Sequence, residues 1–317
     1  DGKRMASGGE DGRVMIWDAE RGTSLRTFKA KGRVNGIAFS PDGKRLAAGG
    51  MGDGVHVWDV ETGQHLIVFR GQAGIIRSVA FSPDGSRLAS AGADREVAVW
   101  DAAAAERAAI PLPKCRVVSL AFSPDEKVVF GGCGDGLVRA WDTATGRLVR
   151  TIGKPVPGVN GVPLAIHPDG RRIFNGASTP SVWDARDGKL LASRIGLVSA
   201  AACSPDGKHL ATADNRRMVQ LRSWATLEAE RDLPLVSDAL IYTGLALAYT
   251  REGDYLALRT PDGVKVWEVA TGRQLAEDHA ELRPVHGSQS GGVHQRRRAR
   301  EIGRGERRGR ELGQVGD

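Results

Sequence analysis

The stretch VNGIAFSPDGKRLAAGGMGDGVHVWDVETGQHLIVF, residues 34–69, decides the fold. It holds four short apolar runs, at residues 34–39, 45–49, 55–58 and 65–69. Runs of this length between Gly- and Asp-rich segments predict β-strands. The Ser40-Pro41-Asp42-Gly43 segment predicts a tight hairpin, because proline presets φ and Asp-Gly accepts a positive φ. The stretch therefore predicts one antiparallel sheet of four strands.

The same pattern recurs along the chain. The seven tryptophans fall on one period, at Trp17, Trp58, Trp100, Trp141, Trp183, Trp224 and Trp267. The steps between them are 41 to 43 residues, and the next residue is aspartate in five cases. Ser-Pro-Asp-Gly occurs in phase at residues 40–43, 82–85 and 204–207, with degenerate copies at 123–126, 167–170 and 250–253. A period of 40 to 45 residues indicates a repeat architecture.

One four-stranded sheet cannot bury both of its faces, and seven stacked around an axis can. The sequence therefore predicts an all-β, seven-bladed propeller over residues 1–280. Asp1-Gly2-Lys3 aligns with Asp42-Gly43-Lys44, so residue 1 falls inside a hairpin turn and the first blade lacks its innermost strand here. That strand would come from upstream or from the C-terminal region, where a new strand is due at Pro284-Val285. No window shows a helical period.

Taken together, these features resemble WD40 repeat proteins, and the even spacing is similar to that of bacterial members. The resemblance rests on the Trp-Asp pairs, the Ser-Pro-Asp-Gly hairpins and an aspartate in the turn between the second and third strands, at Asp11, Asp53, Asp94, Asp135 and Asp262. Repeats of the family often carry a Gly-His pair, whose histidine bonds this aspartate. The matching segments here are Ala30-Lys31-Gly32 and Gly71-Gln72-Ala73, so the resemblance implies an incomplete hydrogen-bonded tetrad.

Residues 281–317 differ in composition from the rest. They carry nine arginines against five acidic residues, whereas the other 280 residues have a net charge of only +3 out of the total of +7. They have many glycines and no strand alternation, which predicts a disordered or frameshifted tail. Binding of nucleic acid through this tail is an alternative, although it has no interleaved aromatic residues for base stacking.

No catalytic or metal-binding motif is present. Cys115, Cys133 and Cys203 have no ligand spacing, and the histidines form no ligand pair, so the expectation is a protein without cofactor, metal or enzymatic activity. A propeller enzyme, of the metal-dependent lactonase/hydrolase or quinoprotein kind, is the other alternative. It requires acid and histidine clusters facing the channel.

The resemblance implies that the innermost strands open onto one face, where propellers of this family bind peptides or partner domains. The candidate rim residues are Arg33, Asn35, Arg77, Arg116, Asn160 and Ser199. Charged and amide groups around a rigid opening favour an acidic or polar segment. The expectation is a cytoplasmic, monomeric interaction scaffold that binds a protein or peptide partner and no membrane. It can be the sensing or scaffolding part of a larger protein, and a nucleic-acid partner is not expected.

Overall fold

The computed structural model describes residues 3–103, 107–111, 116–156, 162–176, 179–214, 218–234, 246–260 and 263–275. Asp1–Pro284 forms one compact unit, and Val285–Asp317 forms a second, which lies outside the described residues. The predicted strand at Pro284-Val285 and the predicted disordered tail therefore also lie outside them. Within the described residues, all regular structure is β, and no helix is long and apolar enough to cross a membrane.

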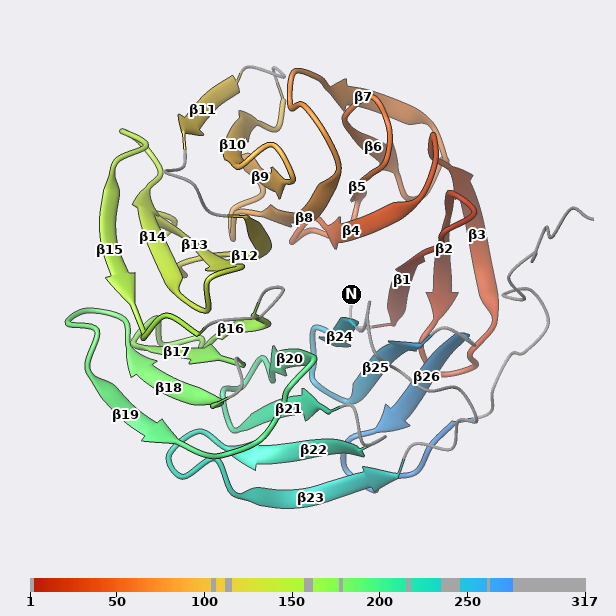
Figure 1. Ribbon diagram of the computed structural model, residues 1–317. Coiled ribbons are helices and arrows are strands. Elements are labelled where there is room, and N and C mark those ends of the chain that lie inside the picture. The colour runs from red at the N-terminus through yellow and green to blue at the C-terminus, as the bar shows by residue number, and fades with distance from the viewer. Residues whose placement is uncertain are drawn as a thin grey trace, which may run out of the picture. The chain divides into compact units, whose positions relative to one another are not determined.

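Seven antiparallel sheets form a ring (Figure 1). They are here called blades 1 to 7 in chain order, from the sheet that begins at Arg4 to the sheets that begin at Val34, Ile76, Val117, Leu164, Ala200 and Ala246. Their strands are named a to d from the inside of the ring outward. Strands a are β4 (Val34–Phe39), β8 (Ile76–Phe81), β12 (Val117–Phe122), β16 (Leu164–Ile166), β20 (Ala200–Cys203) and β24 (Ala246–Tyr249). Strands b are β1 (Arg4–Gly8), β5 (Arg45–Gly50), β9 (Arg87–Gly92), β13 (Val128–Cys133), β17 (Arg172–Asn175), β21 (His209–Ala213) and β25 (Tyr255–Thr260).

Strands c are β2 (Arg13–Asp18), β6 (Val55–Asp59), β10 (Glu96–Asp101), β14 (Val138–Asp142), β18 (Ser181–Asp184), β22 (Met218–Ser223) and β26 (Gly263–Glu268). Strands d are β3 (Ser24–Lys29), β7 (His65–Phe69), β11 (Arg107–Pro111), β15 (Leu148–Ile152), β19 (Leu190–Ser193) and β23 (Ala229–Pro234). The prediction of a seven-bladed propeller whose first blade lacks its innermost strand is confirmed. Blade 7 also has three strands among the described residues, with one further bridge between Trp267 and Gln274.

The Ser-Pro-Asp-Gly segments form the hairpins between strands a and b, as predicted. Ser40 Oγ donates to Asp42 Oδ1 over 2.5 Å and accepts the backbone N–H of Arg45 over 2.9 Å, while Gly43 adopts a φ of 70°. Ser82, Ser123 and Ser204 make the same bond to an aspartate. In these four hairpins the hydroxyl and the aspartate hold the turn closed, so the register of each is fixed locally.

Each tryptophan packs towards the preceding blade. Trp100 lies 5.3 Å from the ring of Phe69 in blade 2, and Trp17 packs with Ala257 and Val266 of blade 7. The others, Trp58, Trp141, Trp183, Trp224 and Trp267, lie in or against the corresponding clusters between blades. Apolar packing between blades 1 and 7 thus closes the ring, and the tryptophan period is a packing period.

Blade 3 contains a complete hydrogen-bonded chain in which glutamine takes the place of histidine. Trp100 Nε1 donates to Ser90 Oγ over 2.8 Å, and Ser90 Oγ donates to Gln72 Oε1 over 2.7 Å. Gln72 Nε2 continues the chain to Glu96 O over 3.1 Å and to Asp94 Oδ1 over 3.4 Å. The amide both accepts and donates, as a neutral imidazole does, so the missing histidine costs blade 3 none of these bonds.

Blades 4 and 5 show the incomplete tetrad that the sequence predicts. The Nε1 atoms of Trp141 and Trp183 have no hydrogen-bond partner among the described residues. Gly131 stands where Ser90 stands in blade 3, and Asn175 turns its amide to Gly136 O over 2.9 Å. Blades 4 and 5 therefore rely more on packing and less on this polar chain.

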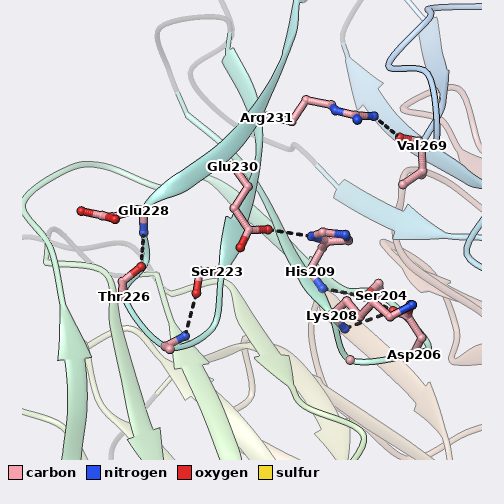
Figure 2. Close-up of polar contacts among 12 residues, drawn as sticks. Ser204, Asp206, Lys208, His209, Ser223, Thr226, Glu228, Glu230, Arg231 and Val269 are labelled. Atoms are coloured by element: carbon pink, nitrogen blue, oxygen red, sulfur yellow. Dashed lines mark hydrogen bonds and ion pairs between the residues drawn. The ribbon is translucent and has the colours of Figure 1, made fainter.

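Arginines link neighbouring blades by binding backbone carbonyls. From strands d, Arg26 donates to Glu61 O over 2.7 Å, Arg150 to Ala185 O over 2.5 Å, and Arg231 to Val269 O over 2.7 Å (Figure 2). From strand b, Arg45 donates to Gly85 O over 2.7 Å. The acceptors lie in turns of the next blade, so these guanidinium groups join neighbouring blades.

Candidate functional site

Antiparallel order places two kinds of connection on each face of the ring. The d–a loops and the b–c turns lie at one end of the strands, and the a–b and c–d turns lie at the other. The first of these, here called the entry face, carries the starts of strands a. The candidate rim residues belong to it. Asn160 lies outside the described residues.

Three arginines on consecutive blades form what is here called the arginine arc: Arg33, Arg77 and Arg116. Arg33 is exposed and pairs with Glu10 over 3.0 Å. Burial lowers the pKa of the Arg77 guanidinium below its ordinary value, and the positive charges of Arg116 and Arg33 lower it further. Arg33 and Arg116 are thus each close enough to Arg77 to repel its charge. The Nε atom of Arg77 is buried and has no acceptor among the described residues.

Arg77 does not occupy the position in its blade that Arg33 and Arg116 occupy in theirs. Arg33 and Arg116 precede strands β4 and β12, but Arg77 is the second residue of strand β8 and not a residue before it. Ile75 occupies the position that Arg33 has in blade 2, and Arg77 matches Asn35. As a result Arg77 is partly buried, and its aliphatic part contributes to packing.

The other two described rim residues are engaged with the fold. Asn35 Nδ2 donates to Ile76 O of the next blade over 3.3 Å, and the backbone N–H of Ser199 donates to Ala213 O over 2.8 Å. Further polar bonds join the innermost strands in the same way, from Leu120 N to Ser78 Oγ over 3.1 Å and from Ser119 Oγ to Val162 O over 2.7 Å. This belt fixes blades 2 to 5 against one another beneath the arginine arc.

Close approach of strands β4 and β8 completes that support. A Cβ atom added to Gly36 would lie 2.9 Å from both Ser78 Cα and Val79 N, which are backbone atoms.

We expect Gly36→Ala to lower the free energy of unfolding by about 1–3 kcal/mol, because the two strands must separate. Gly196→Ala is the matched control, since nothing lies within 4 Å of its added Cβ, and its effect should stay within about 0.5 kcal/mol. Urea titration followed by circular dichroism measures both, and equal stability of the two variants would contradict this packing.

The aspartates of the b–c turns, on the same face, stabilise their own turns. Asp11 accepts the N–H of Arg13 over 3.0 Å, and Asp135 accepts that of Leu137 over 3.1 Å. Asp135 also holds Arg139 by two bonds, of 3.0 and 2.6 Å. Asp262 lies outside the described residues. These carboxylates fold their own turns, and Asp135 in addition neutralises an arginine.

A second polar cluster surrounds Asp53 in blade 2, which sequence reasoning did not find. Asp53 accepts from His56 over 2.9 Å, from Arg70 over 3.2 Å and from Lys31 over 3.4 Å, and these donors hold its pKa well below the ordinary value. His56 Nδ1 lies 3.0 Å from His65 Nε2. The pairing of β6 with β7 brings the two histidines together. Lys31 and Arg70 therefore share the one carboxylate of Asp53.

Neither of the two described cysteines is placed for nucleophilic chemistry. Burial raises the pKa of the Cys203 thiol to about 12, so this thiol stays protonated at neutral pH. Cys133 is buried, and Cys115 lies outside the described residues. The described residues hold no group of three or more His, Cys, Asp or Glu side chains that could bind a metal ion.

Comparisons with known proteins agree with this geometry. The family model described as "WD domain, G-beta repeat" matches residues 1–18, 22–59, 63–101 and 111–142. A 42-residue segment is 45% identical to "Small ribosomal subunit protein RACK1" of Schizosaccharomyces pombe, over 13% of each chain. A 40-residue segment is 48% identical to "Ribosome biogenesis protein BOP1 homolog" of Caenorhabditis elegans, over 13% of this chain and 6% of that protein. The chain thus matches only a small part, 13% or less, of the length of these relatives. With four matched repeats and seven blades in a ring, the chain belongs to the WD40 repeat family.

Proposed function

We propose that this propeller is a non-catalytic interaction scaffold that binds an acidic segment of a partner protein at the arginine arc. Propellers of this family are typically non-catalytic platforms for protein partners. The observation that carries the proposal is the group of three arginines on consecutive blades, in which the charges of Arg116 and Arg33 add to burial in lowering the pKa of the Arg77 guanidinium.

The contrast with other arginines of the chain supports this choice. Arg26, Arg45, Arg150 and Arg231 are bonded to backbone carbonyls. Within the arc, the charges of Arg116 and Arg33 act on Arg77, and a carboxylate placed beside Arg77 would offset that repulsion. Hydrogen bonds between guanidinium and carboxylate groups are among the stronger ones in proteins. Since the belt beneath the arc is rigid, little order has to be gained on binding.

The partner's composition follows from the charge of the arc. An extended segment with several glutamates or aspartates fits it, and the attraction should weaken as salt screens it. We also propose that the propeller is monomeric and cytoplasmic. The similarity to two proteins with ribosomal names extends over about one repeat, the unit that carries the fold, and it favours no particular partner.

A site-resolved measurement tests the proposal. In a ¹⁵N-labelled sample titrated with a ten-residue polyglutamate peptide, the Nε–Hε signal of Arg77, assigned by its loss in Arg77→Met, should shift saturably, and the shift should shrink in high salt. The Nε–Hε signal of Arg231, whose guanidinium binds Val269 O and Ala270 O in a c–d turn, is the internal control and should stay in place. Saturable binding that leaves the Arg77 signal unmoved would contradict the proposal.

A further inference from the structure

The d–a loop between strands β19 and β20 exposes two large apolar side chains. Ile195 is 94% exposed and Leu197 is 54% exposed. With Gly196 between them, they are here called the apolar tip. A Cβ added to Gly196 would meet nothing within 4 Å, so the tip stands clear of the rest of the described protein. Exposed apolar side chains that stand together on a surface mark interaction sites.

Both ends of the loop are anchored, so the tip is held in this position. The backbone N–H of Arg194 donates to Pro180 O over 2.9 Å, and that of Ser199 donates to Ala213 O over 2.8 Å. Val198 turns inward against the core between blades 5 and 6. The chain therefore buries one apolar side chain of this loop and leaves its two neighbours outside, although the same fixed base could have presented polar residues.

The two d–a loops that the structure describes in full alongside this one do present small or polar residues. The loop before blade 2 carries Lys31 and Gly32, and the loop before blade 3 carries Gly71 and Gln72. The turn geometry thus does not require bulky apolar side chains. The folding of the loop therefore does not explain why Ile195 and Leu197 stand before blade 6.

The charge beside the tip indicates which partner would cover it. Arg194 is exposed and forms no ion pair within the described residues. Burial and the charge of Arg194 lower the pKa of Arg222, whereas the carboxylates of Asp214 and Asp232 raise it. Arg222 is itself engaged with Thr212 Oγ1 over 2.9 Å. The apolar tip, with the exposed Arg194 beside it, fits a segment that carries bulky apolar side chains next to carboxylates.

The apolar tip also lies on the entry face, since it belongs to a d–a loop. We propose that it anchors the apolar side chains of the same acidic segment that binds the arginine arc, which makes the partner an acidic segment with at least one large aliphatic or aromatic residue. This inference rests on the proposed function. An extended segment of 12 residues spans up to about 40 Å, so one short peptide can contact more than one blade.

Two 12-residue probe peptides test it, one in which glutamate alternates with leucine and one in which serine replaces each leucine. Binding is measured by fluorescence anisotropy to the wild type, to Ile195→Ser/Leu197→Ser, and to the control Leu25→Ser/Leu66→Ser. The control removes two half-exposed leucines from the outer strands β3 and β7. The wild type should bind the leucine peptide about tenfold more tightly than the serine peptide, which corresponds to partial burial of one or two aliphatic side chains.

The tip variant should lose this preference and bind both peptides as the wild type binds the serine peptide, while the control variant keeps it. If the wild type binds the two peptides equally, the tip proposal fails and the arginine arc proposal stands. If substitution of the arc leaves the affinities of both peptides unchanged while the tip variant loses the preference, the arc proposal fails instead, and if neither peptide binds, both fail. A wild-type dimer that the tip variant abolishes would make the tip a contact between copies, and flotation of the wild type, but not of the tip variant, with phosphatidylserine vesicles would make it a membrane contact. Either result overturns the proposal.

Discussion

Trp100→Ala is expected to lower the free energy of unfolding by about 3–5 kcal/mol, the usual cost of truncating a buried aromatic side chain. Trp100 is 1% exposed and packs against Phe69 of the neighbouring blade, so its loss leaves a cavity between blades 2 and 3. Its removal also deprives Ser90 Oγ of a donor inside the chain that runs to Gln72. The cavity and the lost hydrogen bond both lower the free energy of unfolding.

Trp183→Ala is the matched comparison in blade 5. Trp183 is only partly buried, and its Nε1 has no hydrogen-bond partner among the described residues. Its substitution should therefore cost clearly less than that of Trp100. Urea unfolding followed by far-ultraviolet circular dichroism measures both variants. Full stability of Trp100→Ala together with loss of peptide binding would show that the tryptophan serves a ligand and not the packing of the ring.

The fold could be predicted from the sequence because each repeat contains its own turn and packing signals. Strands β4 and β7 begin and end at the predicted residues, Val34–Phe39 and His65–Phe69. The two strands between them, β5 and β6, extend one residue further than the apolar runs, to Gly50 and Asp59. The closure between blades 1 and 7 was left open, because it depends on packing between residues about 250 positions apart, such as Trp17 and Val266.

The candidate site could be predicted only in part. The sequence places Arg33 and Arg116 at the starts of strands, but the register that puts Arg77 inside β8 depends on how many residues each loop holds. Gln72 shows its role only when its amide is seen between Ser90 and Asp94. The apolar tip could not be predicted either, because Ile195 and Leu197 look like core residues until both ends of their loop are placed.

Removing the arginine arc should have the largest effect on binding. The variant combines Arg33→Ala, Arg77→Met and Arg116→Ala, with methionine at position 77 because the stem of Arg77 is partly buried and an unbranched apolar side chain preserves its packing. Each guanidinium is assigned about 1 kcal/mol of binding free energy, a modest value for charged hydrogen bonds at a partly exposed site. Three such losses correspond to about 100-fold weaker binding. The fold should not be destabilised, since the repulsion on Arg77 disappears.

The control variant is Arg147→Ala/Arg171→Ala/Arg186→Ala, which removes three exposed arginines from the c–d and a–b turns of the opposite face. It has the same net charge as the arc variant.

The most direct test of the central claim is the dissociation constant of a fluorescent polyglutamate peptide at low ionic strength, measured for the wild type and both variants. The arc variant should bind about 100-fold more weakly than the wild type, and the control should bind almost as the wild type does. Equal affinities of the two variants, whether both are retained or both are lost, would contradict a binding site at Arg33, Arg77 and Arg116.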